Sequence, residues 1–317
     1  MVFLNALQSM LSITLITFLG YFLSRRGMIH REVEDFIPKF NLNVVVPLYL
    51  MGAVMEHFTH DQFLSLIKAS ILPFLSIVVS FWLFWLIGLA LRIDRKHLGL
   101  AATAAATSNT IFIGIPVNNA LFGEAGLIHL LLYFISNTLF FWTFGVWAIS
   151  REGTVDGKRP STLDVVKHVF SPPLLGTLAG IAIVILDIPM PRLVGDTCNL
   201  LGGICSPLAL IFVGCLLSHV DWKTVHMGRD LMLTILGRIL LTPLVTIAVV
   251  HLTPIDVDEL TRNIYIVQAG LPCMTNIAII SAYYGADREF GSIFVSISTI
   301  VGMISVPIWM TLLTSLM

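Results

Sequence analysis

Two long apolar segments of the chain, residues 97–121 and 262–284, carry polar and helix-breaking residues at their centres. The first reads TSNT at 107–110, and the second reads PCMTN at 272–276. Hydrocarbon offers no partner for a freed backbone N–H or C=O, so an interrupted helix persists in a membrane only beside a protein-lined cavity. A pair of such interruptions, one in each half of a chain, indicates the substrate site of a secondary transporter.

The side chains at these two centres are neutral hydrogen-bonding groups. Amides and hydroxyls can donate to a carboxylate or complete the oxygen shell of a cation, so they do not fix the sign of a ligand. A broken helix also presents new termini at mid-depth, and free N–H groups at an N-terminus bind carboxylates. We therefore predict substrate contacts at Asn109, Thr110, Pro272, Thr275, Asn276 and Arg238. Support of the helix breaks or of a cation is predicted for Ser108, Gly114, Pro116, Gln268, Gly270 and Asn137. The alternative is that these groups only satisfy the freed backbone.

Arg238 is the one charged side chain placed well inside an apolar segment. A central arginine costs about 2.5–3.5 kcal/mol on insertion scales, which is tolerated when the side chain has a partner or a watery cavity. Its guanidinium could attract a carboxylate substrate. It could equally bind backbone carbonyls where the two broken segments meet, or extend toward the side of Arg229. The sequence leaves these readings open.

The composition is that of a membrane protein. The 317 residues are 56% hydrophobic and 12% charged, with a mean hydropathy of +0.91, whereas soluble domains are about 25% charged. A net charge of −1 argues against nucleic acid as a partner and leaves the lipid bilayer as the expected environment. Apolar runs of about 20 residues, each enough to cross the hydrocarbon, predict ten spans at 4–24, 37–55, 69–91, 97–121, 127–149, 171–188, 196–218, 230–251, 262–284 and 290–315.

The positions of lysine and arginine predict the orientation of these spans. Because ten spans place alternate connections on one side, fourteen of the 18 Lys and Arg residues fall on one face and three on the other. Cytoplasmic connections carry the excess of positive charge. We therefore expect a multi-pass protein of the cell membrane, such as a bacterial inner membrane, with both termini outside the cytoplasm.

The two halves of the chain share a pattern that indicates an inverted repeat. In the second span Pro47 is followed by Gly52, and in the seventh span Pro207 is followed by Gly214. A unit of five spans must be inverted in its second copy, because five is odd. The predicted parts are a first repeat, a cytoplasmic loop and a second repeat at 1–150, 151–170 and 171–317.

Three motifs resemble signatures of the auxin efflux carrier family, which includes plant auxin carriers and bacterial permeases for malonate, malate and similar acids. They are TSNTIFIGIPV (107–117), GRILLTPL (237–244) and VQAGLPCM (267–274). The resemblance runs over essentially the whole chain. It implies an all-α polytopic membrane protein of ten helices in a 5+5 inverted repeat, with helices 4 and 9 crossing where they break. It also implies a scaffold from helices 1, 2, 6 and 7 and a transport domain from helices 3–5 and 8–10.

The chain departs from the plant carriers in two places. Ser108 and Ile277 stand where those carriers have proline, so the breaks here are expected to rest on glycine, asparagine and the retained Pro272. The short connection at 151–170 lacks the long regulatory loop of the plasma-membrane carriers. A bacterial permease of the malonate or malate type therefore resembles this chain better.

Together these features predict a secondary transporter that moves a small organic anion, a mono- or dicarboxylate, by alternating access at the crossing. A bile-acid-type sodium symporter of another organic solute and a channel stay as alternatives. No carboxylate or histidine lies near the middle of a predicted span, which favours sodium coupling or facilitated movement over proton symport. We predict no other cofactor, and a homodimer is an open alternative for the assembly.

An enzyme is the rival class. The spans contain no paired aspartates, no HExxH and no serine with a histidine at depth, which intramembrane proteases require. The four cysteines lie inside predicted spans without metal-ligand spacing, so neither a catalytic residue nor a metal site is predicted.

Overall fold

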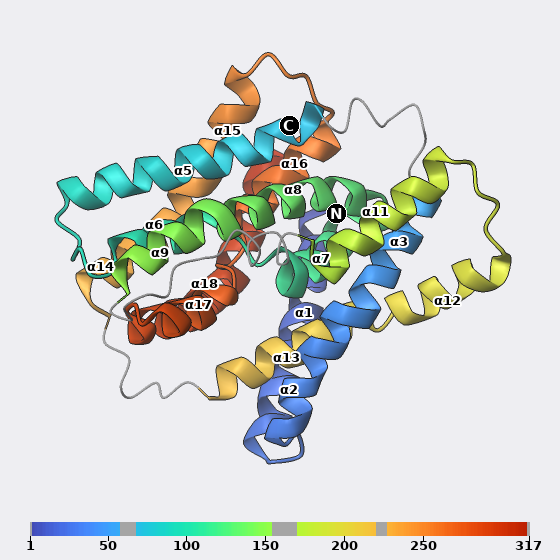
Figure 1. Ribbon diagram of the computed structural model, residues 1–317, viewed down its shortest axis with the longest axis horizontal. Coiled ribbons are helices and arrows are strands. Elements are labelled where there is room, and N and C mark those ends of the chain that lie inside the picture. The colour runs from blue at the N-terminus through green and yellow to red at the C-terminus, as the bar shows by residue number, and fades with distance from the viewer. Residues whose placement is uncertain (1, 58–67, 154–169, 220–226, 316–317) are drawn as a thin grey trace. The chain divides into compact units, whose positions relative to one another are not determined.

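The computed structural model describes residues 2–57, 68–153, 170–219 and 227–315, and within these ranges it is helical throughout, with one isolated β-bridge in place of any sheet (Figure 1). In the same ranges, six helices are long and apolar enough to cross a membrane, and three shorter apolar helices accompany them. The prediction of an all-α polytopic membrane protein is confirmed. The count of ten spans and the inverted repeat stay predictions. The predicted loop at 151–170 lies, apart from its ends, outside the described residues.

The helices form two compact units, each of which draws on both halves of the sequence. Unit 1 comprises Met1–Ile67, Ile111–Leu132 and Phe170–His219, and unit 2 comprises Lys68–Thr110, Tyr133–Val169 and Val220–Met317. The roles of scaffold and transport domain stay predictions.

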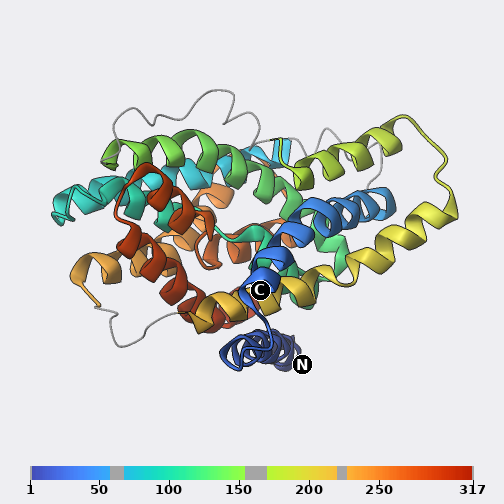
Figure 2. The ribbon, with the colours of Figure 1, turned by 60° about the horizontal axis from the view of Figure 1, so that its bottom comes forward.

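Unit 1 is built on two long helix pairs. Helix α1 (Val2–Arg25) packs along α13 (Cys205–Ser218), and α3 (Val46–His57) packs along α11 (Pro172–Ile185). The α3–α11 pair lies side by side in both views (Figures 1 and 2). Each pair joins one helix from each half of the chain. The remaining elements are α2 (Arg31–Phe40), η1 (Asn41–Val45), α7 (Ile115–Phe122), η4 (Glu124–Gly126) and α12 (Arg192–Gly202).

Glycines let these helix pairs approach until their backbones touch. A Cβ placed on Gly214 of α13 would overlap the carbonyl oxygen of Thr17 on α1, and a Cβ on Gly176 of α11 would overlap that of Pro47 on α3. Membrane helices lack a hydrophobic force between them and associate through such close packing of small residues. The glycine positions therefore fix the spacing of both pairs.

Unit 2 surrounds a short, fully buried helix, α6 (Leu98–Ala106). Its sequence, LGLAATAAA, has mostly small side chains, which allow α5 (Ile71–Ala90), α9 (Val146–Glu152) and α14 (Arg229–Leu236) to pack against it. The other elements of unit 2 are η5 (Phe141–Gly145), η6 (Gly237–Leu241), α15 (Thr242–Leu252), α16 (Glu259–Gly270), α17 (Asn276–Tyr284) and α18 (Arg288–Ser315). Helices η3 (Thr110–Gly114) and α8 (Leu127–Phe140) each contain one of the points at which the chain passes from one unit to the other.

We predict that Gly214→Ala destabilises the protein because the added methyl meets the backbone of α1. Forcing extra volume into a packed site costs about 1–3 kcal/mol, which a lower midpoint of thermal unfolding in detergent would report. Gly195→Ala is the matched control, since nothing lies within 4 Å of the Cβ it would add. Equal midpoints for the two variants would contradict the close contact.

Candidate functional site

Both predicted helix interruptions are confirmed, and the local sequence explains each. Helix α6 ends at Ala106, and Thr107 turns extended with φ −100° and ψ 140°. Ser, Thr and Asn side chains compete for backbone hydrogen bonds and so disfavour a continuing helix. Helix α16 ends at Gly270, and Leu271 is extended with φ −63° and ψ 159°. Proline forces this conformation on the residue before it, and Pro272 follows Leu271.

The two extended stretches pair with each other within unit 2. Ser108 and Cys273 form the isolated antiparallel bridge. The N–H of Asn109 donates to the carbonyl of Pro272 at 2.9 Å, and the N–H of Met274 donates to the carbonyl of Thr107 at 3.3 Å. These bonds satisfy backbone groups that the broken helices leave open, as a low-dielectric interior requires. The breaks therefore meet in a crossing, which we define as residues 107–110 and 271–276.

Asn137 completes the hydrogen bonding of Ser108. The buried Asn137 side chain donates from Nδ2 to the Ser108 carbonyl and accepts at Oδ1 from the Ser108 N–H, both at 2.9 Å. The amide thus acts as a neighbouring strand would. On the other arm, the N–H of Cys273 donates to Ser298 Oγ at 3.3 Å. Tyr133 Oη lies 3.4 Å from Ser108 Oγ.

Arg238 is fully buried and directs its guanidinium at the crossing. Its Nε donates to the carbonyl of Leu271 and its Nη1 to the carbonyl of Ala105, both at 2.8 Å. Its Nη2 donates to Ser108 Oγ at 2.7 Å and to the carbonyl of Ala269. These partners lie in or just beyond the last turns of α6 and α16. A helix C-terminus carries negative partial charge, so one cation stabilises the ends of both half-helices.

The geometry favours the structural alternative that the sequence left open for Arg238. Four of its five N–H donors are directed at three backbone carbonyls and one hydroxyl. Thr242, one turn beyond Arg238, donates to the same Ala105 carbonyl at 2.8 Å. The predicted contact of Arg238 with substrate stays a prediction.

The helices restart at the last residue of each stretch of the crossing. Helix η3 begins at Thr110 and α17 begins at Asn276, whose N-cap residue Thr275 makes no capping hydrogen bond through its side chain. Thr275 and Asn276 are half-buried, whereas Asn109 and Thr110 are buried. The α17 start is therefore the more accessible part of the crossing. Ile277 lies inside α17, so the restart needs no second proline.

The remaining predicted residues are distributed unevenly. Gln268 and Gly270 lie in the last turn of α16, next to the crossing. Gly114 and Pro116 follow Ile111 and belong to unit 1. Sequence reasoning missed Tyr133, Ser298 and Thr242. The sequence could have indicated Thr242, because a residue four positions after Arg238 lies on the same face of a helix.

Comparison with known proteins gives one family over nearly the whole chain. A family model described as membrane transport protein matches residues 5–310. An uncharacterized transporter of Methanothermobacter thermautotrophicus is 24% identical over 99% of this chain and 100% of its own length. An uncharacterized transporter of Methanocaldococcus jannaschii is 21% identical over 94% of this chain and 96% of its own length.

We predict that Arg238→Lys destabilises the protein and reduces transport. A lysine offers one point charge and cannot reach three carbonyls with the planar fork of arginine. Each buried acceptor left without a donor costs about 1–3 kcal/mol, which thermal unfolding in detergent would report. Arg192→Lys, at a side chain that is 94% exposed, should stay within about 0.5 kcal/mol. Unchanged stability with weakened substrate affinity would instead favour the contact of Arg238 with substrate.

Proposed function

We propose that this chain, which belongs to the membrane transport protein family of the auxin efflux carriers, moves a small organic anion by alternating access at the crossing. The family and the transporter names of its relatives make the chain a membrane transporter. The proposed substrate is a mono- or dicarboxylate. The resemblance to bacterial malonate and malate permeases supports acids of that kind. The uneven distribution of lysine and arginine supports a cell-membrane location with both termini outside the cytoplasm.

The position of Arg238 supports an anion as the substrate. The guanidinium binds the C-terminal ends of α6 and α16, where a helix carries negative partial charge. The N-terminal ends that follow, at Thr110 and Asn276, carry positive partial charge and face the same crossing. A carboxylate is the ligand that such N–H groups bind. In this proposal the guanidinium of Arg238 stabilises the crossing, and the helix N-termini attract the carboxylate of the substrate.

The crossing also bears on coupling. The described side chains that hydrogen-bond within it are neutral, apart from Arg238. Hydroxyl, amide and carbonyl oxygens of this kind suit a sodium ion, as in other carriers with broken helices. We propose sodium coupling, or facilitated movement of the anion down its gradient, in preference to proton symport through the crossing.

A competition experiment in proteoliposomes tests the substrate class. We expect saturable uptake of a labelled carboxylate from a set containing malonate, malate, lactate and aromatic acetates. Asn276→Ala should raise the KM about tenfold or more if its side chain donates to the bound anion, because a hydrogen bond to a charged group contributes about 1.5–3 kcal/mol. The exposed Asn43, whose side chain bonds the carbonyl of Lys39, provides the control Asn43→Ala.

Competition by neutral or cationic compounds, with none by a carboxylate, would contradict the proposed substrate. Uptake that rises linearly with concentration would indicate a channel. Binding of a larger organic solute with strict sodium dependence would favour a symporter of the bile-acid type.

Uptake under separately imposed gradients tests the coupling. We expect uptake to respond to a sodium gradient or to the membrane voltage, and to be insensitive to a proton gradient at constant pH inside the vesicles. The measurement uses the acid found in the competition experiment. Strict dependence on the proton gradient, with indifference to sodium, would contradict this prediction.

A further inference from the structure

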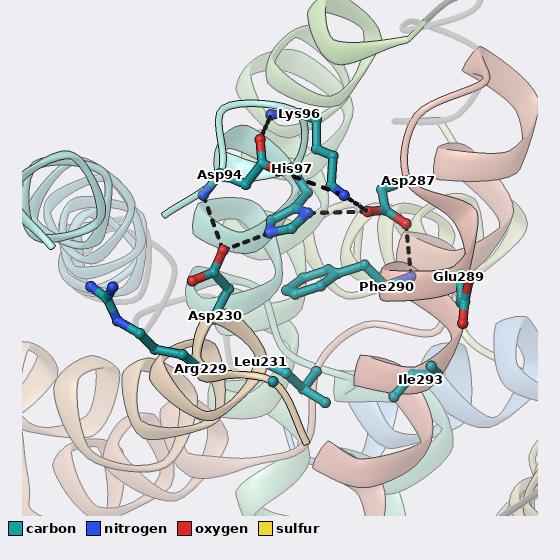
Figure 3. A pocket seen from close by; sticks show the side chains of 11 residues that line it. Asp94, Lys96, His97, Arg229, Asp230, Leu231, Asp287, Glu289, Phe290 and Ile293 are labelled. Carbon is teal, nitrogen blue, oxygen red and sulfur yellow. Dashed lines mark hydrogen bonds and ion pairs between the residues drawn. The ribbon is translucent and has the colours of Figure 1, made fainter. Parts of the chain in front are cut away.

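A second polar cluster of unit 2 surrounds His97, the residue before α6 (Figure 3). The His97 side chain is 8% exposed. Its Nε2 lies 3.1 Å from Oδ2 of Asp230, and its Nδ1 lies 3.1 Å from Oδ2 of Asp287. The ring of Phe290 stacks on the imidazole, with centroids 4.3 Å apart and planes 9° from parallel. Packing thus holds the ring with both nitrogens facing carboxylates.

This geometry requires a proton that the separate groups do not need at neutral pH. A neutral imidazole has one N–H, whereas an ionised carboxylate can only accept hydrogen bonds. Both bonds form together only if His97 is doubly protonated or if one aspartate holds a proton. The closed arrangement therefore binds one proton more than neutral histidine and two free carboxylates. Imidazole is also the side chain that ordinarily changes its charge between pH 5 and 8.

Other charged groups line the same pocket of about 440 Å³. Lys96 Nζ lies 4.0 Å from Asp287, and the N–H of Asp94 donates to Oδ2 of Asp230 at 3.0 Å. The N–H of Lys96 donates to Oδ1 of Asp94 at 3.0 Å and lowers the pKa of that carboxyl, and the ammonium of Lys96 acts in the same direction. Arg229 and Glu289 also line the pocket (Figure 3).

Glu152 faces His97 from α9. It interacts electrostatically with His97 and Asp287, and its carboxylate accepts the N–H groups of Gly99 and Leu100 at the start of α6. An experiment on this cluster must therefore distinguish the effect of Glu152 from that of His97, Asp230 and Asp287.

The cluster joins the starts of three helices. His97 precedes α6, Asp230 lies in the first turn of α14, and Asp287 precedes α18. Helix α6 leads to the crossing and α14 leads to Arg238. The nine residues of α6 separate the cluster from the crossing by about 13 Å at 1.5 Å per residue. The cluster is therefore separate from the crossing, where the substrate is proposed to bind.

We propose that His97, Asp230 and Asp287 form a regulatory proton-binding site that fastens the starts of α6, α14 and α18 to one another. Loss of the proton removes one of the two bonds to His97 and loosens this end of unit 2. Because the fastened state binds one more proton, acid favours it and alkali favours the opened state. The proton acts here as a ligand and is not carried with the substrate.

Hydrogen exchange of the full-length protein in lipid nanodiscs tests this site without a transport substrate. The readout is the amide protection of residues 229–232 and 288–291, corrected for the intrinsic pH dependence of exchange. We expect protection to fall as the pH rises from 5.5 to 8.5, by up to tenfold per pH unit for one linked proton. Asp287→Asn and His97→Gln should each flatten this dependence, and the first serves alone if the second does not fold.

Two controls make the outcome specific. His219→Gln removes an exposed histidine of unit 1, 2.6 Å from Glu34, and should leave the pH dependence unchanged. Glu152→Gln should also retain most of the pH dependence of amide protection. Protection independent of pH in the wild type, or dependence that Asp287→Asn retains and Glu152→Gln removes, would overturn the proposal. Neither readout requires uptake, so failure here is distinct from failure of the proposed transport function.

Discussion

The structure of unit 2 depends on the bonds between one buried guanidinium and the ends of two half-helices. Each helix end leaves carbonyls without partners inside the helix, and a membrane interior supplies none. Arg238 meets this requirement for α6 and α16 at once, through the carbonyls of Ala105, Ala269 and Leu271. An arginine is suited to the task because its donors form a fixed planar fork that stays charged. The bridge between Ser108 and Cys273 pairs further backbone groups of the two extended stretches, and the amide of Asn137 bonds the N–H and the carbonyl of Ser108.

This arrangement makes the crossing electrostatically asymmetric. Its C-terminal ends are compensated by a cation, while its N-terminal ends at Thr110 and Asn276 retain positive partial charge. An anion held by helix termini needs no buried base of its own, which agrees with the neutral side chains around it. Unit 1 is built on another principle, since glycines bring its helix backbones into direct contact. Alternating access by relative movement would use one tightly packed unit and one unit that carries the proposed site.

The sequence predicted the helix breaks because polar residues, glycine and proline inside an apolar segment conflict with an unbroken membrane helix. It left the role of Arg238 open, because the choice between substrate and carbonyls depends on distances that no spacing along the chain contains. Ser298 and Tyr133 were missed for a related reason, since a lone hydroxyl in an apolar helix gives no periodic signal. The cluster of His97, Asp230 and Asp287 was missed because its members are far apart in the sequence. Each of them alone resembles an ordinary polar residue at a helix end.

We propose that the crossing binds the transported anion and opens to each side of the membrane in turn. Labelling of Thr275→Cys with a membrane-impermeant thiol reagent tests it most directly, because Thr275 is half-buried at the start of α17 and the four native cysteines are buried. We expect Thr275→Cys to react from either side of oriented vesicles, and a transported carboxylate to slow the reaction from both sides. Reaction from one side only, unchanged by any transported acid, would contradict it.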